Sequence, residues 1–496
     1  MKLLTKLIFF LFVYQLFPAA IAQNVNGVIV SDSANITVIK LWGTHYERGF
    51  AYGYLTGDKI SDVVNGYIKP VFGIYMDAAR QIIINGDDLS IDSVYVTEAM
   101  AIIDGMNEAG TNFENIDYID ELVFNSFLDV LKLLGFSDDN FGCSSLMSWG
   151  DATVGTPLNG MSVISRHLDW TPNQTLIDNQ VLVIHIPAEE DEQPWAMVGF
   201  AGQMSVLSGF NQNIAVFQHM MSDFIGLTYH GLHYEPIWLT LRKAIEKSDF
   251  NNDDENNTQD VRDAIGLNTN GYANGYIVTS IAPSTANADS LIAMVAEVAP
   301  QSPKLTFRSN SYPDDIPGDN LYAANFEIKR NNHNHYGSRY YAVMNAIGDG
   351  LEIGEDENWQ IMKDNSNGQS GNIQFMQFIP ELNTFKLTVY RDNTPAYLNN
   401  PIIYNVNELL SISTYINKSE RQNISLYPNP VNELLHLNVN KSDVGSGYLI
   451  ISCDGKIMIK GIITNISFSI NTETLDSGIY FIKTEDSTVK KFIKIE

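Results

Sequence analysis

Cys143 is the residue of this sequence best suited to covalent chemistry. It is one of two cysteines, with Cys453, and two are too few for a disulfide framework or a multi-cysteine zinc site. Arg166 and Asp169 follow it within Val-Ile-Ser-Arg-His-Leu-Asp-Trp. A guanidinium beside a thiol lowers the thiol pKa and favours the nucleophilic thiolate, and a turn could bring Asp169 close to Arg166. These residues indicate thiol attack on a carbonyl, with a buried cysteine beside a structural Arg–Asp pair as the alternative.

Other side chains that could bind a metal ion do not form a complete ligand set. Two pairs of histidines are suitably spaced, but no cysteine or acidic ligand is obviously close to them in the sequence. Two acidic loops could bind calcium, yet neither has the full twelve-residue ligand pattern. We interpret all of these, and His45, as structural or solvated residues, and expect no metal ion and no cofactor. The four segments are residues 230–233, 333–335, 251–255 and 364–368.

The elements that must position these side chains change in character along the chain. Helical periodicity dominates the first third, strand-like runs begin after residue 140, and helices and strands then alternate. This order predicts a layered α+β architecture without internal repeats. The helical patterns cover residues 46–55, 93–106, 118–134, 235–247, 258–265 and 339–346, and the strand-like runs cover residues 161–165, 181–186, 214–217, 276–279, 291–297, 375–379 and 385–390.

Six short motifs, in order, resemble those of N-terminal-nucleophile hydrolases of the acyl-CoA:6-aminopenicillanic-acid acyltransferase type, relatives of choloylglycine hydrolases and acid ceramidases. The central two are Gly142-Cys143 and Arg-His-Leu-Asp-Trp at residues 166–170, which is similar to the family's Arg-Asn-Leu-Asp-Trp/Phe. The resemblance covers residues 40–392 and implies a four-layer αββα sandwich. The other motifs are Gly-Thr-His-Tyr-Glu-Arg-Gly at 43–49, Ser-Gly-Phe-Asn at 208–211, Ala-Asn-Phe at 324–326 and Ser-Arg at 338–339.

The resemblance also implies a mechanism. The protein would cut its own chain before Cys143, and the freed α-amine, with a reference pKa of about 7.7–8.0, would act as the base for the thiol of the same residue. Asp169 would orient the amine, and Arg166 would stabilise the thiolate and bind substrate. Asn325 would donate to the tetrahedral oxyanion, and Arg339 would support the site electrostatically. The implied reaction is hydrolysis of an N-acyl amide, or acyl transfer, through a Cys143 thioester.

Three positions depart from the family pattern. His167 replaces the asparagine after the arginine, and Ala324 replaces the threonine of the family's Thr-Asn step. The position of a second oxyanion-binding side chain falls near residues 219–222, where no asparagine is present. Backbone amides or Asn274, which precedes a strand-like run, could supply that donor, and the alternative for Asn274 is a turn residue.

Both ends of the chain resemble export signals. Residues 1–22 combine Lys2 and Lys6, a short apolar run and Ala-Ile-Ala, which predicts a signal peptide cleaved after Ala22. Residues 425–496 open with Tyr-Pro-Asn-Pro, contain Leu-Asp-Ser-Gly-Ile-Tyr and end in Lys-Phe-Ile-Lys before the last two residues. This stretch resembles the C-terminal sorting domain of the type IX secretion system. The resemblance implies a Gram-negative source, the secretion machinery as a partner, and removal of the domain; an ordinary binding β-sandwich is the alternative.

The expected organisation is therefore a sandwich with a small all-β domain after it. The chain has 58 acidic against 30 basic residues, a net charge of −28, which disfavours nucleic acid as a partner. No later apolar run is long enough for a permanent membrane span, so we expect the protein to be secreted or held at the cell surface. The predicted segments are a signal peptide (1–22), a helical first segment (23–142), a catalytic core (143–410), a linker (411–424) and the sorting domain (425–496).

Two other functions stay open at this point. A papain-like cysteine peptidase would use Cys143 with a separate histidine base. A non-enzymatic surface protein on the same fold would bind a ligand but leave Gly142–Cys143 intact. Neither the acyl amide nor the choice between hydrolysis and acyl transfer is specified by the residues.

Overall fold

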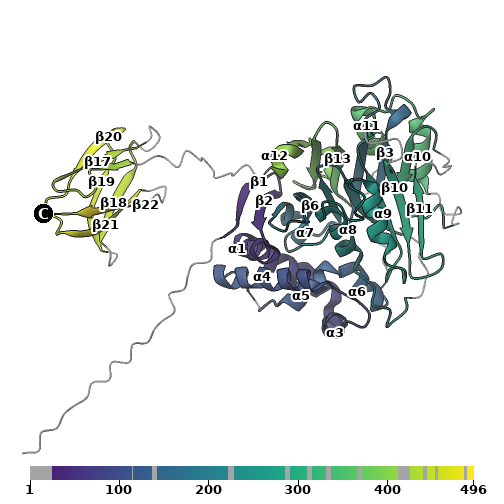
Figure 1. Cartoon of the computed structure of the whole chain (residues 1–496), viewed down its shortest axis with the longest axis horizontal. Helices are drawn as coiled ribbons and strands as arrows, with labels where there is room; N and C mark the ends of the chain where they lie inside the picture. Colours follow the sequence, from purple (N-terminus) through teal and green to yellow (C-terminus); the bar gives the residue numbers. More distant parts are fainter. Residues whose placement is uncertain are drawn as a thin grey trace, which may run out of the picture. The chain divides into compact units, whose positions relative to one another are not determined.

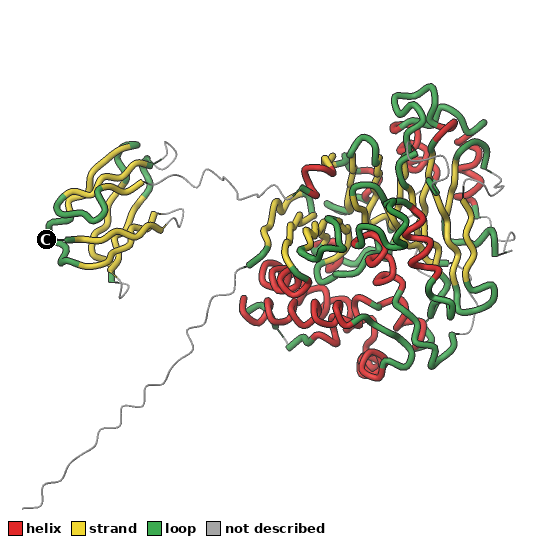
Figure 2. The backbone as a smooth tube through the Cα atoms, viewed as in Figure 1, coloured by secondary structure: helices red, strands yellow, loops and turns green. Residues whose placement is uncertain are grey.

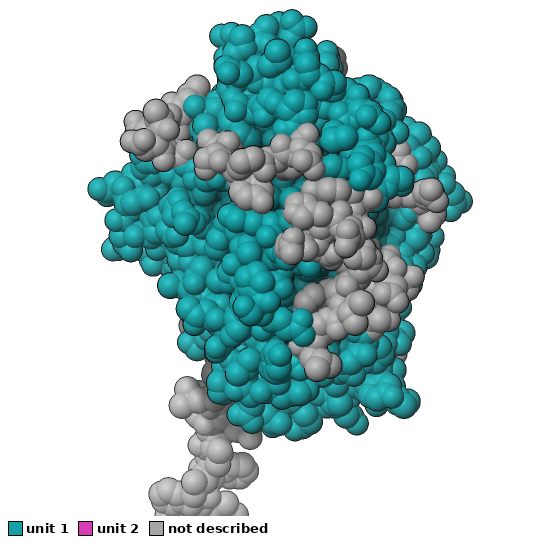
Figure 3. Space-filling view, turned by 90° about the vertical axis from the view of Figure 1, so that its right-hand side faces the viewer, with its two compact units in different colours: residues 1–411 teal, residues 412–496 magenta. Residues whose placement is uncertain are grey.

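The computed structural model divides the chain into two compact units, residues 1–411 and residues 412–496 (Figure 1). Figure 2 shows the distribution of helices and strands in each unit, and Figure 3 shows one face of the first unit in teal. The expected signal peptide, most of the expected linker and Cys453 lie outside the described residues. The described residues are 25–113, 115–136, 142–221, 228–284, 291–309, 316–330, 337–366, 371–411, 425–439, 444–452, 456–484 and 489–495.

A nine-stranded sheet forms one half of the sandwich in the first unit. Its strand order is β1-β2-β5-β6-β7-β8-β9-β10-β11. Strand β2 (Ile36–Gly43) pairs in parallel with β5 (Gln180–Pro187), so the residues before the Gly142–Cys143 junction contribute an edge of this sheet. The other strands are β1 (Gly27–Ser33), β6 (Trp195–Phe200), β7 (Ser208–Asn211), β8 (Ala215–Met220), β9 (Tyr276–Ile281), β10 (Ala293–Val298) and β11 (Leu305–Ser309), each antiparallel to its neighbours apart from that pair.

The second sheet is six-stranded and antiparallel, in the order β12-β3-β4-β13-β14-β15. In the register of β3 with β4, Cys143 lies opposite Leu168 and Ser145 lies opposite Arg166. Because paired residues point to the same face, Cys143, Ser145 and Arg166 share one face of this sheet. The strands are β3 (Gly142–Ser148), β4 (Val163–Asp169), β12 (Asn320–Ala323), β13 (Asn372–Ile379), β14 (Thr384–Val389) and β15 (Ile402–Asn405).

Three apolar clusters separate four layers. One cluster fills the space between the two sheets, with Leu182 and Ile184 from the first sheet against Met147 and Ile164 from the second. The largest packs α1, α4, α5, α6, α8 and α9 on the outer face of the nine-stranded sheet. The third packs α10 and α11 on the outer face of the six-stranded sheet. Figure 1 shows α1, α4 and α5 below the strands and α10 and α11 at the upper right, and the predicted four-layer αββα fold is confirmed.

The helices of the first unit largely follow the predicted pattern. The predicted helix over residues 118–134 is two helices, because Ser126 between them has φ −122° and ψ 21°. None of the described helices has both the length and the apolar character needed to cross a membrane. The helices are α1 (His45–Val63), α2 (Lys69–Phe72), α3 (Met76–Asn85), α4 (Ser93–Ala109), α5 (Tyr118–Asn125), α6 (Phe127–Leu133), α7 (Gln174–Asp178), α8 (Ile237–Glu246), α9 (Thr258–Gly266), α10 (Ser338–Ile347), α11 (Glu355–Asn365) and α12 (Val406–Leu410).

Glycines in α1 and α4 let the two helices pack at very short range. A Cβ at Gly53 would lie 1.9 Å from the Ile102 carbonyl oxygen, and one at Gly105 would lie 2.1 Å from the Phe50 carbonyl oxygen. Thr44 caps the start of α1, and its side chain and that of Glu47 bond reciprocally to the backbone. Gly49 of the motif at residues 43–49 packs in the same way, because a Cβ there would lie 2.6 Å from the Glu98 carbonyl oxygen, so the motif helps to fix the first helical layer.

The second unit is a small β-sandwich. Its three-stranded sheet has the order β16-β17-β20, and its four-stranded sheet has the order β19-β18-β21-β22. Buried apolar residues from both sheets, among them Leu435, Leu437, Ile450 and Ile482, form its core. The strands are β16 (Ser425–Tyr427), β17 (Leu434–Asn438), β18 (Gly447–Ser452), β19 (Ile457–Ile462), β20 (Ser467–Asn471), β21 (Gly478–Thr484) and β22 (Val489–Lys494).

Candidate active site

Cys143 is the second residue of β3, and its side chain is buried beside a guanidinium. Arg166 Nη2 lies 3.7 Å from the Cys143 sulfur and also donates to the Gln218 carbonyl oxygen at 3.1 Å. Arg166 is fully buried, and its Nε and Nη1 have no hydrogen-bond partner among the described residues. Buried donors without partners are costly, so their place beside a thiol suits a group that stabilises a developing negative charge.

The surroundings keep the Cys143 thiol protonated at neutral pH in the uncut chain. Burial raises the pKa of the thiol, and the Asp169 carboxylate acts in the same direction. The Arg166 guanidinium, a backbone hydrogen bond from Asp169 and the Arg339 charge offset part of this effect on the pKa. Attack by this sulfur on a carbonyl therefore requires a base that removes the thiol proton.

The backbone nitrogen of Cys143 is held by the side chain of Asn325. The Cys143 N–H donates to Asn325 Oδ1 at 3.0 Å, and Arg339 Nη2 donates to the same oxygen at 2.6 Å. Asn325 Nδ2 donates to the Met220 carbonyl oxygen at 2.8 Å. Two donors on the oxygen and one acceptor on the nitrogen fix which way the amide points. Asn325 thus holds the nitrogen of Cys143 and keeps a second Nδ2 hydrogen outside these three bonds.

Asp169 and Arg339 meet next to Gly142. Arg339 Nη1 donates to Asp169 Oδ2 at 3.1 Å, and Asn372 Nδ2 donates to Asp169 Oδ1 at 3.0 Å. A Cβ at Gly142 would lie 3.4 Å from Asp169 Cβ and 3.6 Å from Arg339 Nη2. The glycine therefore lets a carboxylate and a guanidinium approach the peptide unit that precedes Cys143. All five catalytic residues expected from the sequence thus meet around this junction.

One geometric expectation for this site was wrong. Strand β4 continues through Asp169, so no turn folds this residue back onto Arg166, and the two side chains leave opposite faces of the strand. Asp169 pairs with Arg339 of α10 instead. His167, on the Asp169 side, bonds to the Met362 carbonyl oxygen at 3.0 Å. Burial lowers the pKa of His167 to about 3, so the ring is neutral.

A buried histidine in β8 links the strand of Cys143 to the backbone before Asn325. His219 Nε2 lies 2.9 Å from Ser145 Oγ, and His219 Nδ1 lies 3.4 Å from the Ala324 carbonyl oxygen. A carbonyl can only accept, so Nδ1 carries the proton and Nε2 accepts from the hydroxyl. Burial lowers the pKa of His219 well below its ordinary value. The neutral ring therefore connects two elements of the site without reaching the sulfur.

Strand β8 as a whole supports the site from the opposite sheet. Its Gln218 carbonyl oxygen accepts from Arg166, its Met220 carbonyl oxygen accepts from Asn325, and the His219 ring lies between them. The sequence did not indicate this role, because two of the three contacts use backbone oxygens. A run of polar residues in an otherwise apolar strand, Gln218-His219, was the one available indication.

The remaining candidate residues have other partners. Asn274 is buried, and its Oδ1 accepts from the Gly275 N–H at 2.8 Å, as expected for a turn residue. His230 lies 3.0 Å from Asp88 Oδ2 at an exposed position, and His233 bonds to a backbone carbonyl. The expected second oxyanion position at residues 219–222 is described only through residue 221. The histidines at 333 and 335 and residues 367–368 lie outside the described residues.

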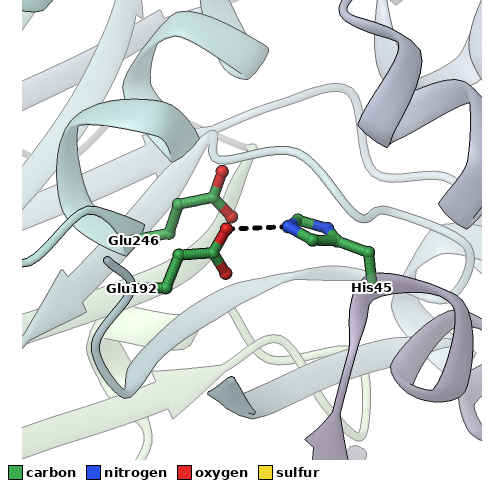
Figure 4. Close-up of side chains that lie close together, drawn as sticks. All are labelled: His45, Glu192 and Glu246. Atoms are coloured by element: carbon green, nitrogen blue, oxygen red, sulfur yellow. Dashed lines mark hydrogen bonds and ion pairs between the residues drawn. The ribbon is translucent and has the colours of Figure 1, made fainter. Parts of the chain in front are cut away.

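A separate buried cluster contains side chains of the metal-ligating type. Ligand atoms of His45, Glu192 and Glu246 all lie within 4.8 Å of one another (Figure 4). His45 was interpreted from the sequence as structural. Each of the three side chains also bonds to protein groups, among them Glu98, Arg48 and Arg242.

Comparison with known proteins identifies the C-terminal unit. Residues 425–495 match the family model described as the secretion system C-terminal sorting domain. This match confirms the sorting domain expected from the sequence and indicates that the protein is secreted or displayed at the cell surface.

The chain is also similar to three known proteins at low identity. Protein dcd1B of Dictyostelium discoideum is 22% identical over 241 residues, which are 46% of this chain and 47% of that protein. The chain thus spans about half the length of this curated relative. An N-acylethanolamine-hydrolyzing acid amidase ortholog of Caenorhabditis elegans is 11% identical, with a TM-score of 0.36 over 53% of this chain and 100% of that chain.

A mutant of conjugated bile acid hydrolase from Clostridium perfringens is 12% identical, with a TM-score of 0.33 over 54% of this chain and 94% of that chain. Both of these solved structures are of hydrolases.

Proposed function

We propose that the protein is a secreted N-terminal-nucleophile amidohydrolase or acyltransferase that acts on a small N-acyl amide through a thioester at Cys143. The supporting observation is that the sulfur and the backbone nitrogen of Cys143 are each held by a separate group. Arg166 contacts the sulfur, and Asn325 holds the nitrogen. If Cys143 becomes the first residue of a chain, this arrangement suits its sulfur to act as the nucleophile and its nitrogen to act as the base.

Cleavage of Gly142–Cys143 would supply the base that the buried thiol needs. An α-amine has a reference pKa of about 7.7–8.0, so part of it is unprotonated at neutral pH. The nitrogen already bonds to Asn325 Oδ1 as an amide, and as an amine it would keep this acceptor. The amine would take the thiol proton, directly or through one water, and the sulfur would become the nucleophile.

The other groups have roles that follow from their atoms. Arg166 would stabilise the thiolate and, with its unpartnered Nε or Nη1, bind a substrate oxygen. Asn325 would use the Nδ2 hydrogen that is not bonded to Met220 to donate to the oxyanion. Asp169 and Arg339 would set the position of the amine, since both lie next to the peptide unit before Cys143.

The reaction then balances without a cofactor. The thiolate attacks the amide carbonyl carbon, and the carbonyl electrons move to oxygen. As they return, the C–N bond breaks and the ammonium of Cys143 returns a proton to the leaving amine. Water then attacks the thioester, releases the acid and restores the thiol, or an acceptor amine takes the acyl group. Self-cleavage would begin with attack of the same sulfur on the Gly142 carbonyl carbon, so that the acyl group moves from the Cys143 nitrogen to the sulfur and the thiol proton moves to that nitrogen. Water would then hydrolyse this thioester, which frees the Gly142 carboxylate and the Cys143 thiol.

A separate histidine base, as in papain-like peptidases, has no support at this sulfur. In the described part of the chain no histidine bonds to Cys143 Sγ, and both nitrogens of His219 bond elsewhere. The described hydrogen bonds of His167 are to Met362 and Asn372. A binding protein on the same fold would leave the Arg166 donors unexplained, although it would have the same overall architecture.

A panel of acyl amides tests this proposal. The mature protein is incubated with N-acyl amino acids, bile-acid conjugates, β-lactams and lipid amides, and the released amine is measured. We expect release from at least one class, loss of release after thiol alkylation, and none from Cys143→Ala. Amine release that persists in Cys143→Ala would contradict the assignment of the nucleophile.

A further inference from the structure

A buried ionic network joins the two parts of the catalytic unit that cleavage before Cys143 would separate. It lies under α1 and α4 on one side and against α8 and the β5–β6 connection on the other. Most of its members are buried, and several of its ion pairs cross from one part to the other, among them His45–Glu192, Arg48–Glu192 and Glu98–Arg242. The members before the junction are His45, Arg48, Tyr95 and Glu98, and those after it are Glu189, Glu192, Arg242, Glu246 and Lys247.

His45 lies at the centre of this network with a carboxylate on each ring nitrogen. Its Nδ1 lies 2.6 Å from Glu98 Oε2. Its Nε2 lies 2.9 Å from Glu192 Oε1, the contact that Figure 4 draws as a dashed line. Carboxylates only accept, so both nitrogens carry hydrogens and the ring is an imidazolium. Arg242 Nη2 lies 3.1 Å from Nδ1, but it donates to Glu98 Oε2 at 2.6 Å, so Arg242 and His45 both donate to this oxygen. The residue is 4% exposed. The bond to Glu192 crosses the junction, because His45 precedes it and Glu192 follows it.

The charges around His45 balance only when the ring is protonated. Four carboxylates, those of Glu98, Glu189, Glu192 and Glu246, face three permanent cations, Arg48, Arg242 and Lys247. Asp191 also pairs with Lys247, but it is 73% exposed and its charge is screened by water. His185 is buried nearby, and burial keeps its pKa well below the ordinary value, so it adds no charge. The proton on His45 supplies the fourth positive charge.

A metal ion fits this cluster less well than a proton. The ligand atoms of His45, Glu192 and Glu246 are close enough to hold an ion. However, Glu246 Oε2 already accepts from Arg242 Nε at 2.8 Å, and Glu192 Oε2 accepts from Arg48 Nη2 at 3.2 Å. A divalent ion in place of one proton would leave an excess positive charge in a buried site.

We propose that this ionic network holds the first segment, up to residue 136, on the rest of the catalytic unit, and that it requires a protonated His45 to do so. The inference rests on the proposed function and deepens it, because the contacts of the network are needed most once the chain is cut. It adds to the parallel pairing of β2 with β5, which also crosses the junction.

Because His45 must be protonated, the contribution of this network to the association of the two parts depends on pH. Burial alone would lower the pKa of His45, but hydrogen bonds to Glu192 and Glu98 raise it from 6.5 to about 9. Its contribution is therefore complete below pH 6.5 and is lost as the pH rises towards 9. Burial alone would raise the pKa of Glu192, but His45 and Arg48 lower it from 4.5 to about 2. The contribution of the Glu192 carboxylate to association is therefore lost only as the pH falls from 4.5 towards 2. Association should be strongest between these limits, from pH 4.5 to 6.5.

The test cuts the chain artificially, so it does not depend on self-cleavage. A site for a specific protease is placed between Phe136 and Gly142 of the full-length Cys143→Ala chain, the chain is cut, and the affinity of the two pieces is measured from about pH 6 to about pH 9.5, a range that spans the titration of His45. We expect the affinity to fall as the pH rises. His45→Gln should weaken it about 10- to 100-fold at the acidic end of this range and remove most of the fall.

His230→Gln is the matched control. His230 also pairs with an acidic residue across the junction, Asp88, but its side chain is 64% exposed. Such a pair contributes little, so we expect less than about a 3-fold change. If His45→Gln does not fold, Glu192→Gln replaces it, with weaker association expected at the acidic end of the same range.

Two outcomes would overturn the proposal. One is an unchanged pH dependence in both His45→Gln and Glu192→Gln. The other is dissociation of the wild-type pieces by EDTA at the acidic end of the range together with one equivalent of bound metal, which would assign the cluster to a metal ion. A wild-type chain that never cuts itself would contradict the proposed function but leave this result standing.

Discussion

Two atoms of Cys143, the sulfur and the backbone nitrogen, would take part in the reaction, and a different side chain contacts each of them. Its sulfur contacts Arg166, which is anchored on the backbone of β8, and its nitrogen contacts Asn325, which is anchored on the same strand two residues later. Burial raises the pKa of the thiol, which makes a nearby base necessary. The nitrogen of the same residue becomes that base only if the preceding peptide bond is cut.

At this scale Asn325 is the most informative side chain to change. Asn325→Ala removes both the acceptor for the Cys143 nitrogen and a donor near the reacting carbonyl. We expect kcat to fall roughly 10²–10³-fold, the loss found when an oxyanion-hole donor is removed. Steady-state kinetics on the substrate identified by amine release would measure this.

Asn358→Ala is the control for the loss of a buried amide. Asn358 is fully buried and bonds to Ser148 Oγ at 3.1 Å on the same strand as Cys143, but away from the nucleophile. It should lower thermal stability with little change in kcat. Turnover at the wild-type rate in Asn325→Ala would move the amine-holding and oxyanion roles to other groups.

At the scale of elements, β8 determines where Arg166 and Asn325 lie relative to β3. The strand belongs to one sheet, and the nucleophile belongs to the other. His219 connects Ser145 on β3 with the Ala324 carbonyl, directly before Asn325. Its ring does not contact the sulfur, so it acts by positioning.

A change at His219 should therefore affect turnover more than binding. His219→Gln is expected to reduce kcat about 10- to 100-fold, because a displacement of about 1 Å in a reacting group has effects of this size. KM should change little. The measurement is the kcat and KM of the variant beside its melting temperature.

His185→Gln is the matched control for this variant. His185 is an equally buried, neutral histidine of the same sheet, and its ring nitrogens have no hydrogen-bond partner among the described residues. It should change the melting temperature without the loss in kcat. Equal losses of kcat in the two variants would show that His219 supports only the fold.

Secondary-structure elements and the residue types of the site could be predicted from the sequence better than the geometry of the site could. Hydrophobic periodicity located most helices and strands, since each pattern is local. The end of β4 at Asp169 and the break at Ser126 were missed, because pairing with β13 and packing decide them. The contacts of β8 were missed because two of them use backbone carbonyl oxygens, which every residue has. The His45 network was missed because its members are far apart in the sequence.

At the scale of the whole molecule, the chain combines a four-layer αββα unit with a sorting domain. The sorting domain has its own apolar core. The first unit contains both sides of the Gly142–Cys143 junction, joined by a sheet edge and by the His45 network.

Export makes a prediction about the mature chain. Residues 1–22 have the pattern of a cleaved signal, and residues 425–495 match the sorting domain. Protein recovered from the culture medium or cell surface of the native host should begin at Gln23 and lack the residues after about 425. N-terminal sequencing and intact mass would show this, and recovery of the full chain 1–496 would contradict it.

The most direct test of the central claim is the intact mass of the purified, active wild-type protein. We predict two pieces that co-purify, one ending at Gly142 and one beginning at Cys143. Cys143→Ala should remain one uncut, inactive chain, and Cys143→Ser should cut slowly, because a hydroxyl is the weaker nucleophile at neutral pH. Active protein with a single chain running through residue 143 would contradict the mechanism and would require a base other than the amine of Cys143.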